Sequence, residues 1–406
     1  MKIAMVSEHA SPLACLGGVD AGGQNVHVAE LSLALARRGH SIVVYTRADR
    51  PGLARRVTMA PGVQVEHVTA GPLAGIGKDE LLPHMPAFAA QLARRWRRDR
   101  PDVAHAHFWM SGLAATEAGA LTSVPVVQTF HALGTVKHRW QPEADTSPES
   151  RIGTERRVAR TVERIIATCT DEVKELTSLG ASRSSIDVVP CGVDVELFRP
   201  SSIRPGTARP RRLLVLGRLV PRKGVEDAIR ALAAIPDTEL LVVGGPAAQE
   251  LDADPEVRRL RSVCDAVGVI DRVRFAGRVA HGELPAVISS CDLLLAVPWY
   301  EPFGIAPLEA MACGLPVVAN AVGGMLDTVV PGRTGMLVPP GDQAALISTI
   351  SNLLDDAPLR RRMSAAGVRR ARDLYTWDAV AARTEQSYLS VLAGRGDADT
   401  VAGVGR

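Results

Sequence analysis

The sequence predicts an α/β protein made of two doubly wound, Rossmann-like domains, and three observations support this. The chain has 406 residues, which exceeds what one hydrophobic core usually organises. Short apolar runs alternate with helical patterns along most of its length, as in parallel sheets whose strands are joined by helices. A polar, proline-containing stretch without any period follows Phe198 and indicates a linker between two such series.

Each domain is expected to hold a parallel sheet, because each apolar run is followed by a segment long enough to cross over it. In the first half, strands are predicted at Ile3–Val6, Ile42–Tyr45, Val63–Val68, Val103–Ala106, Val126–Thr129, Ile165–Thr168 and Ile186–Val189. In the second half, they are predicted near Leu213–Leu216, Leu240–Val243, Val273–Ala276, Leu293–Val297 and Val317–Ala319. The predicted parts are an N-terminal domain 1–199, a linker 200–212, a C-terminal domain 213–375, a helix 376–393 packing back on the first domain, and a frayed tail 394–406.

The composition argues against several classes of protein. Hydrophobic residues make up 46% and charged residues 22% of the chain, which is ordinary for a soluble α/β protein. The net charge of +3 is too small at this length to indicate a nucleic-acid partner. Six cysteines lie far apart without a C-x-x-C pair, as expected for reduced thiols of a cytoplasmic protein. The first apolar run is too short for a secretory core, and no run of about 18 apolar residues predicts a membrane span.

Residues 84–100 have the pattern of a basic amphipathic helix. Met85, Phe88, Leu92 and Trp96 recur at helical spacing, and five arginines cluster toward the end of the segment. Such a helix can lie on an anionic membrane, but it more often faces a protein core and exposes its basic side to solvent. We favour the core-facing helix and expect no membrane contact.

The nine residues from Glu301 to Glu309 point most directly to function. They follow a buried strand and lead into a helix, with Pro307 suited to the first turn. The helix N-terminus near Gly304 and Ile305 offers backbone N–H groups and the positive end of the helix dipole, which attract phosphate. The two flanking glutamates can accept hydrogen bonds from hydroxyls. This pattern predicts a nucleotide-sugar site; the alternative is a surface helix whose glutamate stabilises the dipole.

Two cations and a glycine-rich loop follow the first strands of the two domains. Arg218 and Lys223 come after the first strand of the second domain, at the same sheet edge as the glutamates, where they could neutralise a departing pyrophosphate. Exposed loop cations are common, so the two carry weight only together. Residues 17–25 of the first domain are rich in glycine but do not match G-x-G-x-x-G. They predict either close backbone approach to a ligand or a flexible turn.

Three other features are candidate catalytic or metal sites. His131 lies just beyond a predicted strand and is either a structural histidine or a catalytic one at the sheet edge. His105 and His107 share one strand face without a third ligand, so packing or lining is favoured over a zinc site. Asp252-Ala253-Asp254 resembles a metal-binding D-x-D, but the following Pro255 indicates a helix start, and no metal site is predicted.

Together, these motifs resemble those of glycosyltransferase family 4, retaining enzymes with the two-Rossmann GT-B architecture. The resemblance rests on the stretch 301–309, on Gly-Arg-Leu-x-x-x-Lys-Gly at 217–224, on Gly22-Gly23, and on Cys191–Asp194 with Phe198–Pro200. It covers almost the whole chain in the same order. Within the family, the chain is similar to the group of mycothiol-pathway inositol-phosphate glycosyltransferases and sucrose-phosphate synthases. The resemblance implies an acceptor-binding N-terminal domain and a nucleotide-sugar-binding C-terminal domain that face a central cleft.

On the donor side, the resemblance implies that Arg218 and Lys223 bind the diphosphate. Glu309 would bind the ribose, Glu301 the hydroxyls of the donor sugar, and His131 would lie beside the anomeric carbon. The other implied donor-binding residues are Gly22, Gly23, Arg278, Val279, Phe303, Gly304 and Ile305, of which Arg278 and Val279 would meet the base through their backbone. The implied catalytic residues are His131, Glu301, Arg218 and Lys223.

On the acceptor side, Asn25, Lys78 and Arg151 match positions that contact a phosphorylated acceptor in the inositol-phosphate enzymes. Phe108 and Ala132 stand where those enzymes have a tyrosine and a threonine that help to bind the acceptor phosphate. Each lost donor weakens phosphate binding by about 1–3 kcal/mol if the site is buried. The resemblance therefore leaves open whether the acceptor carries a phosphate.

The implied reaction is transfer of a glycosyl group from a UDP-sugar to a hydroxyl of a small sugar, sugar phosphate, cyclitol or natural-product acceptor, with retention of configuration. Three alternatives stay open: an ADP-sugar transferase, such as a heptosyltransferase; a nucleotide-sugar-binding protein without transfer; and an epimerase or phosphorylase of the same fold. No cofactor and no obligatory metal are expected. The expected partners are the nucleotide sugar and a small-molecule acceptor, and a homodimer stays open.

Overall fold

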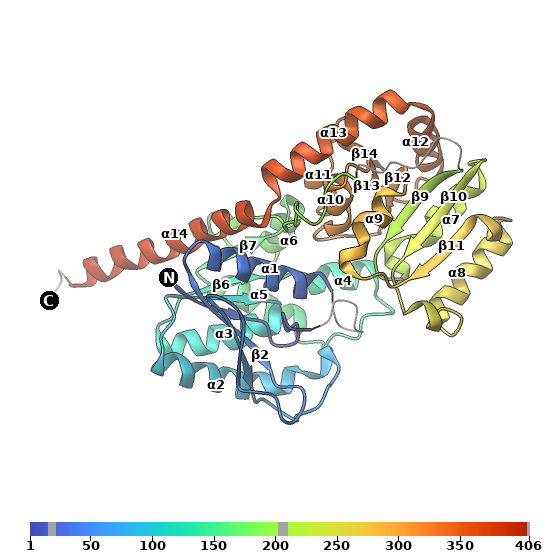
Figure 1. The fold of residues 1–406 in the computed structure, drawn as a ribbon. Helices are drawn as coiled ribbons and strands as arrows, with labels where there is room; N and C mark the ends of the chain where they lie inside the picture. The colour runs from blue at the N-terminus through green and yellow to red at the C-terminus, as the bar shows by residue number, and fades with distance from the viewer. Residues whose placement is uncertain (15–21, 202–209, 404–406) are drawn as a thin grey trace. The chain divides into compact units, whose positions relative to one another are not determined.

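The computed structural model describes residues 1–14, 22–201 and 210–403, which form two compact units. Unit 1 consists of Met1–Pro190 together with the C-terminal segment that begins at Trp377, and unit 2 consists of Cys191–Thr376. Each unit contains one sheet whose strands are linked by helices (Figure 1). The predicted fold class, two Rossmann-like α/β domains, is confirmed.

The sheet of unit 1 has the strand order β3-β4-β2-β1-β5-β6-β7-β8 among the described residues. The strands are β1 (Lys2–Val6), β2 (Ser41–Arg47), β3 (Arg56–Ala60), β4 (Val63–Val68), β5 (Val103–His107), β6 (Val126–Thr129), β7 (Arg164–Ala167) and β8 (Ile186–Val188). All pair in parallel except β3, which pairs antiparallel with β4. Sequence reasoning missed β3, because this half-exposed edge strand has only a short, mixed polar and apolar pattern.

Helices cover both faces of this sheet. They are α1 (Gly23–Arg37), α2 (Met85–Arg98), α3 (Trp109–Thr122), α4 (Gly134–Trp140), α5 (Arg151–Thr161), α6 (Thr170–Ser178) and α14 (Trp377–Gly403), with short 3₁₀ turns at Lys78–Glu80, Leu82–His84 and Arg183–Ser185. Figure 1 shows α1 and α14 on one face and α2 and α3 on the other. The core-facing interpretation of α2 is confirmed, because Met85, Phe88, Leu92 and Trp96 are all buried. No helix in the part of the chain that the structure describes has both the length and the apolar character of a membrane span.

The C-terminal helix α14 is longer than predicted. Trp377, Val380 and Tyr388 join the core that α1 forms with the sheet, as expected for a helix that packs back on the first domain. The helix then continues to Gly403, whereas a frayed tail was expected from Gly394. Once a docked segment has nucleated a helix, each further residue adds a hydrogen bond without a new nucleation cost, and the helix continues past Gly394 and Gly396. Residues 404–406 lie outside the described chain.

The sheet of unit 2 has the strand order β11-β10-β9-β12-β13-β14, and its strands pair in parallel. The strands are β9 (Arg211–Leu216), β10 (Thr238–Val243), β11 (Val273–Gly277), β12 (Leu293–Ala296), β13 (Val317–Asn320) and β14 (Gly335–Val338). The helices are α7 (Val225–Ala233), α8 (Pro255–Ala266), α9 (Leu284–Ser289), α10 (Ile305–Ala312), α11 (Met325–Thr328), α12 (Gln343–Asp355) and α13 (Ala357–Leu374). Short 3₁₀ turns lie at Pro221–Lys223, Ala248–Glu250, Ile270–Arg272 and His281–Glu283. Sequence reasoning missed β14, a short strand that begins with glycine.

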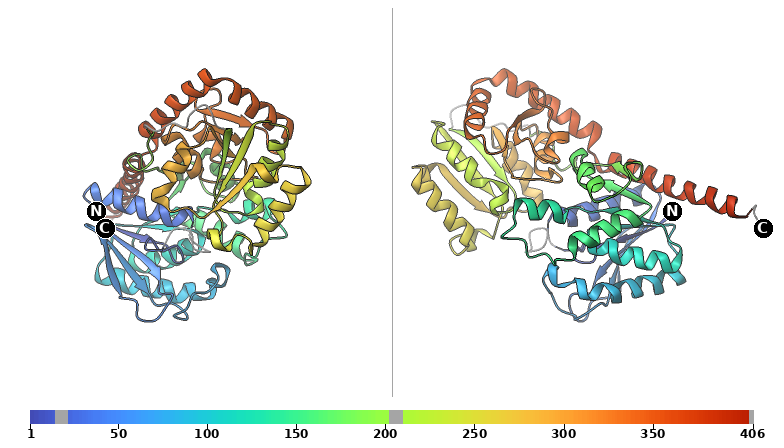
Figure 2. Two further views of the ribbon diagram at one scale, coloured as in Figure 1. Left: turned by 45° about the vertical axis from the view of Figure 1, so that its right-hand side comes forward. Right: turned by 180° about the vertical axis from the view of Figure 1, so that it is seen from behind.

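Alternate residues of the buried strands of unit 2 pack into two separate hydrophobic cores, one on each face of the sheet. Leu213 and Val215 of β9 pack with α7, α8 and α12, whereas Leu214 between them packs with α9, α10 and α13. This alternation follows from the two-residue period of a strand, and it makes every strand position apolar. The helices accordingly lie on both sides of the sheet, as Figure 2 shows from two directions.

The boundary between the units falls earlier than residue 199. The Val193 amide donates to the carbonyl of Tyr375 at 2.7 Å, and Val193 and Phe198 are buried in the core of unit 2. Residues 191–199 therefore belong to unit 2, although they were assigned to the N-terminal domain from sequence. Of the predicted linker 200–212, residues 202–209 lie outside the described chain, and β9 begins at Arg211.

Candidate active site

The candidate donor site of unit 2 is built where strand β12 leads into helix α10. Gly304 precedes the helix with φ of 73° and ψ of 42°, a left-handed conformation that glycine adopts without steric cost. Pro307 lies in the first turn, where its missing N–H is not needed. The first amides of α10 have no acceptor within the helix, so the predicted anion-attracting N-terminus near Gly304 and Ile305 is present.

Lys223 and Glu301 form an ion pair at this edge, although 78 positions separate them. Lys223 ends the 3₁₀ turn after β9, and the Trp299 amide donates to the Arg222 carbonyl at 2.8 Å, which ties this turn to the loop after β12. The next residue, Gly224, has φ of 69°, and a Cβ there would collide with the carbonyl oxygen of Val297. The loop after β9 thus packs closely against the loop after β12 at Gly224, which places Lys223 beside Glu301.

Glu301 is only 8% exposed. Burial alone would raise its pKa, but the charges of Lys223 and Arg222 and the hydrogen bond from Lys223 outweigh burial and hold the pKa below its usual value. The Phe303 amide lies 3.5 Å from the second carboxylate oxygen. Glu301 is therefore an ionised acceptor at neutral pH.

Glu309 lies one turn inside α10, as predicted, and is also 8% exposed. Burial raises its pKa, and His281, whose Nε2 lies 3.5 Å from Glu309 Oε1, offsets only part of that rise. The same burial, with the nearby Glu309 charge, raises the pKa of Cys313 to about 12. The two glutamates thus differ: Glu301 is held by cations, whereas Glu309 lies in an apolar wall beside one imidazole.

Sequence reasoning missed a second pair of glycines that shapes this site. A Cβ at Gly323 would collide with the Glu301 carbonyl oxygen, and the Gly324 amide donates to that same oxygen at 2.8 Å. Asn320, at the end of β13, donates to the Pro298 carbonyl at 3.0 Å from the other side of the loop. The signal was the Gly-Gly dipeptide just after a predicted strand.

The other residues predicted to bind the donor take different positions. Arg218 lies exposed in the loop after β9, near the start of the segment that carries Lys223. Arg278 is exposed just after β11, and its amide donates to the Pro246 carbonyl at 2.8 Å, while Val279 packs on the core. Both loops lie at the carboxyl edge of the sheet of unit 2.

In unit 1, Gly22 precedes α1 and Gly23 begins it. Asn25 lies in the first turn, where its Oδ1 accepts from the Gly22 amide at 3.1 Å and its Nδ2 donates to the Ser11 carbonyl at 2.9 Å. The remaining part of the predicted glycine loop, residues 17–21, lies outside the described chain.

Two residues of unit 1 adopt strained backbone conformations at the carboxyl edge of its sheet. Phe108 follows β5 with φ of 83°, and His131 follows β6 with φ of 63°. Such conformations cost on the order of 1–3 kcal/mol each for residues other than glycine and cluster at functional sites. Both are buried, and both were predicted as site residues from the sequence.

Phe108 and three other predicted acceptor-binding residues, Lys78, Arg151 and Ala132, are linked by contacts. The Lys78 ammonium lies 5.7 Å and the Arg151 guanidinium carbon 5.3 Å from the centre of the Phe108 ring. Arg151 Nη2 donates to the Ala132 carbonyl at 2.8 Å. An aromatic face attracts cations without a hydroxyl, so phenylalanine still positions both side chains.

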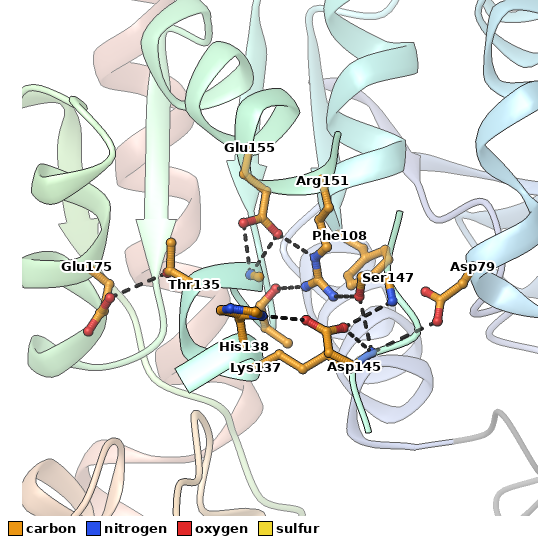
Figure 3. A network of polar contacts seen from close by, with 12 residues as sticks. Asp79, Phe108, Thr135, Lys137, His138, Asp145, Ser147, Arg151, Glu155 and Glu175 are labelled. Carbon is orange, nitrogen blue, oxygen red and sulfur yellow. Dashed lines mark hydrogen bonds and ion pairs between the residues drawn. The ribbon is translucent and has the colours of Figure 1, made fainter. Parts of the chain in front are cut away.

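Arg151 is embedded in a polar network (Figure 3). Its Nε donates to Glu155 at 2.8 Å and its Nη1 to Ser147 at 3.0 Å, while Glu155 also accepts from the Gly134 amide. Lys137 forms an ion pair with Asp145 at 2.9 Å and donates to Ser147 at 3.1 Å. The cations of this edge are thus largely compensated by acidic and hydroxyl groups of the same unit.

The segment Asp252-Ala253-Asp254 leads into helix α8. Asp254 is the N-cap of α8, because its side chain accepts from the Val257 amide at 2.9 Å. Across residues 1–14, 22–201 and 210–403, no group of three or more His, Cys, Asp or Glu side chains is arranged to hold a metal ion.

Comparisons with known proteins agree with this arrangement. Residues 21–197 match the family model described as Glycosyltransferase Family 4, and residues 202–370 match that of glycosyl transferases group 1. The D-inositol 3-phosphate glycosyltransferase of Acidothermus cellulolyticus is 36% identical over 98% of this chain and 92% of its own length. The enzyme of the same name from Mycolicibacterium smegmatis is 38% identical over 88% of this chain and 84% of its own length.

Among solved structures, sucrose-phosphate synthase from Thermosynechococcus elongatus superimposes with a TM-score of 0.88 at 31% identity, over 97% of this chain and 99% of that one. Anabaena HepE, solved in complex with UDP and glucose, gives 0.72 at 22% identity, over 96% of this chain and all of the other, and shows the fold alone. Two parallel α/β units with these sites define a glycosyltransferase of the two-Rossmann, GT-B class. The chain belongs to glycosyltransferase family 4.

Proposed function

We propose that this enzyme transfers a glycosyl group from a nucleoside-diphosphate sugar, with UDP as the nucleotide, to a hydroxyl of a small polyol or sugar acceptor, with retention of configuration. The observation that carries the proposal is the Lys223–Glu301 ion pair beside the N-terminus of α10, with Glu309 buried one turn away. A cation and helix amides suit a diphosphate, and two carboxylates suit hydroxyl-rich groups on either side of it. HepE, a solved structure of this fold, holds UDP and glucose, which supports the choice of UDP.

In this mechanism the residues of unit 2 stabilise the leaving group. Lys223, Arg218 and the amides of Gly304 and Ile305 bind the diphosphate as it gains negative charge. Glu309 accepts hydrogen bonds from the ribose, and Glu301 from hydroxyls of the transferred sugar. The acceptor hydroxyl attacks from the face that the diphosphate leaves, and its proton passes to the departing phosphate oxygen. His131 stabilises the sugar as it gains positive character.

The acceptor contacts Lys78, Phe108, Ala132 and Arg151 in unit 1. A phosphate on the acceptor would compete with Ser147 for Arg151, and with Asp145 for the neighbouring Lys137. Because these cations already have partners, we expect the hydroxyls of the acceptor to contribute to its binding whether or not it carries a phosphate. The D-inositol 3-phosphate glycosyltransferases are the relatives against which this expectation is best measured.

The donor assignment is tested by thermal shift with UDP-, ADP- and GDP-sugars, because a ligand at 100 times its dissociation constant stabilises a protein by about 2.7 kcal/mol. We expect a shift with a UDP-sugar that is smaller in Lys223→Ala and unchanged in Arg230→Ala, a surface cation of α7. A shift with none of the three classes of donor would contradict the proposal.

Transfer itself is tested with the donor that binds. Inositol 3-phosphate and inositol, offered at equal concentrations, separate a phosphorylated from a free acceptor, and NMR of the product reports the anomeric configuration. Donor binding without transfer to these or to other sugars and polyols would favour a binding protein over a transferase. A product of inverted configuration would contradict the retaining mechanism.

A further inference from the structure

Four histidines lie close together inside unit 1. His27 comes from α1, His105 and His107 from β5, and His131 from the turn after β6, and each is at most 3% exposed. The rings of His105 and His107 are 4.1 Å apart, those of His107 and His131 are 5.1 Å apart and stacked, and His27 meets His131 edge to face at 5.1 Å. A buried polar ring is costly unless hydrogen-bonded, so the partners of these nitrogens are informative.

The partners of His107 determine where its proton lies. Its Nε2 is 3.4 Å from the sulfur of Met5 on β1, and its Nδ1 is 2.9 Å from Nε2 of His131. A thioether sulfur accepts hydrogen bonds but has no proton to donate. A neutral His107 therefore carries its proton on Nε2, facing Met5, and presents a lone pair at Nδ1.

This arrangement in turn fixes the tautomer of His131. Because His107 Nδ1 is an acceptor, His131 Nε2 must be the donor in the hydrogen bond between them. A neutral His131 with its proton on Nε2 has a lone pair on Nδ1. The opposite choice would place the lone pair of His107 Nε2 against the lone pairs of Met5.

The other end of the histidine stack is anchored by the C-terminal helix. The Tyr388 hydroxyl of α14 lies 2.7 Å from His105 Nδ1, and Thr129 Oγ1 lies 2.9 Å from His105 Nε2. Trp377, at the start of the same helix, packs edge to face on His27 at 5.5 Å. The stack is therefore held between the sheet and α14 and has little freedom to rotate.

Burial also keeps these rings uncharged. It lowers the pKa of His27 to about 4 and that of His105 to about 3, in the latter case with a smaller contribution from His27. Burial, followed by the neighbouring histidines, holds the pKa of His107 and of His131 well below the usual value. All four are neutral at physiological pH, as the tautomer argument requires.

We propose that His107, fixed by Met5, is a positioning residue that holds His131 as the neutral Nε2-protonated tautomer, so that His131 meets the transferred sugar as an uncharged ring in a fixed orientation. The proposal rests on the function proposed above, in which His131 contacts that sugar. A neutral ring avoids the repulsion that an imidazolium would exert on a sugar gaining positive charge.

The first test is the tautomer itself, read in the free enzyme from long-range ¹⁵N–¹H NMR spectra of histidine-labelled protein, with the His131 signals assigned by loss in His131→Gln. We expect a single tautomer of His131 with the proton on Nε2. Met5→Leu removes the sulfur at similar volume and should give a mixture of tautomers, whereas Met59→Leu, elsewhere on the same core, should not. A proton on Nδ1 in the wild type, or an unchanged spectrum in Met5→Leu, would overturn the proposal.

The second test compares two replacements of His107. In His107→Asn the side-chain oxygen can take the place of Nδ1 and accept from His131, whereas His107→Leu has no acceptor. We expect kcat to fall by about 10- to 100-fold in His107→Leu, by analogy with the partners that orient metal-ligating histidines. In His107→Asn we expect most of kcat to return. UDP binding by thermal shift should be the same in both.

Equal kcat in the two His107 variants, with both folded by circular dichroism, would mean that His107 only fills space, and the proposal would be wrong. Failure of the proposed function looks different. In that case the wild type transfers no sugar from any donor, while the tautomer of His131 still responds to Met5→Leu as described. The spectra therefore judge the positioning role separately from the assay.

Discussion

The two units share an architecture but treat charge in opposite ways at the same sheet edge. In unit 2, the ionised Glu301 meets Lys223 directly, beside a helix N-terminus. In unit 1, the polar groups behind the edge are neutral imidazoles, and the cation Arg151 is already bonded to Glu155, Ser147 and a backbone carbonyl. The edge of unit 2 thus combines an ion pair with a helix N-terminus, whereas the edge of unit 1 combines compensated cations with neutral imidazoles.

Under the proposed function, this difference separates two tasks of a transferase. A departing diphosphate gains negative charge, which fixed cations and amides stabilise. The sugar that it leaves gains positive character, and neutral acceptors tolerate such a group better than cations do. A fold that binds both partners on parallel sheets can therefore specialise one sheet edge for each charge.

The largest expected effect is on the charged edge. We predict that Lys223→Ala and Arg218→Ala each lower kcat by about 10²- to 10³-fold, the scale of a lost charge-stabilising donor. Steady-state kinetics with the donor identified by thermal shift measure this. Arg230→Ala, an exposed cation of the same unit paired with Glu226, is the matched control and should stay close to the wild type. If both site variants retained wild-type rates, the charged edge would have no role in leaving-group stabilisation.

The next effect concerns how that edge is built. Gly224→Ala adds a methyl group against the Val297 carbonyl and forces alanine to φ of 69°, so we expect unit 2 to lose about 2–4 kcal/mol of stability. Gly268→Ala shares the positive φ, 71°, but has open space around it, and should lose only about 1–2 kcal/mol. Denaturant unfolding followed by hydrogen exchange in unit 2 compares them. Equal losses would show that the close approach at Gly224 is relaxed at no cost.

A third prediction concerns acid. Burial lowers the pKa of His27 from 6.5 to about 4, so its neutral form stabilises the folded protein above pH 6.5, and that stabilisation is lost as the pH falls toward 4. We expect unit 1 to lose about 2 kcal/mol between pH 7.5 and 5 through this residue alone.

Tryptophan fluorescence in denaturant measures this loss, because Trp96, Trp109 and Trp377 are buried in unit 1. His27→Gln should reduce the pH dependence, with His105, His107 and His131 still contributing, whereas His138→Gln, at an exposed position, should leave it unchanged. The carboxyl of Glu309 does not add to acid sensitivity, because burial raises its pKa, and a lower pH therefore favours the folded state through this group. A wild-type stability that is flat over this range would contradict the neutral histidine cluster.

The smallest expected effect separates a helix cap from a metal site. Asp254→Ala removes the N-cap of α8 and should cost about 1 kcal/mol, seen as a lower Tm. We expect the response of kcat to added Mg²⁺ or Mn²⁺, or to a chelator, to be the same in this variant and in the wild type. A metal response that disappears only in Asp254→Ala would assign the segment a metal.

The comparison also shows where sequence reasoning succeeds. The apolar runs at Leu213–Leu216 and Leu293–Val297 predicted buried parallel strands correctly, because a strand covered on both faces needs apolar residues at nearly every position. The edge strand β3 and the short strand β14 were missed, since their few residues carry no such signal. The N-terminal domain was drawn nine residues too long because Cys191–Phe198 is held by a core contact with a distant segment.

The site was predictable in the same local sense. Gly304 and Pro307 predicted the start of α10. Because Glu301, Lys223 and His131 each follow a predicted strand, they were expected at sheet edges. The protonation behaviour of each side chain could not be predicted from the sequence. Glu309 and Glu301 occur in one short stretch, yet burial raises the pKa of one while Lys223 lowers that of the other.

The sequence by itself determined the two α/β units, the helix terminus near Gly304 and the residue types available at each edge, because these follow from strand and turn preferences over a few neighbouring residues. The tertiary structure alone decided which side chains meet. Lys223 reaches Glu301 across 78 positions, and Tyr388 reaches His105 across 283. Such contacts depend on strand order and on the docking of α14, and no local preference specifies these.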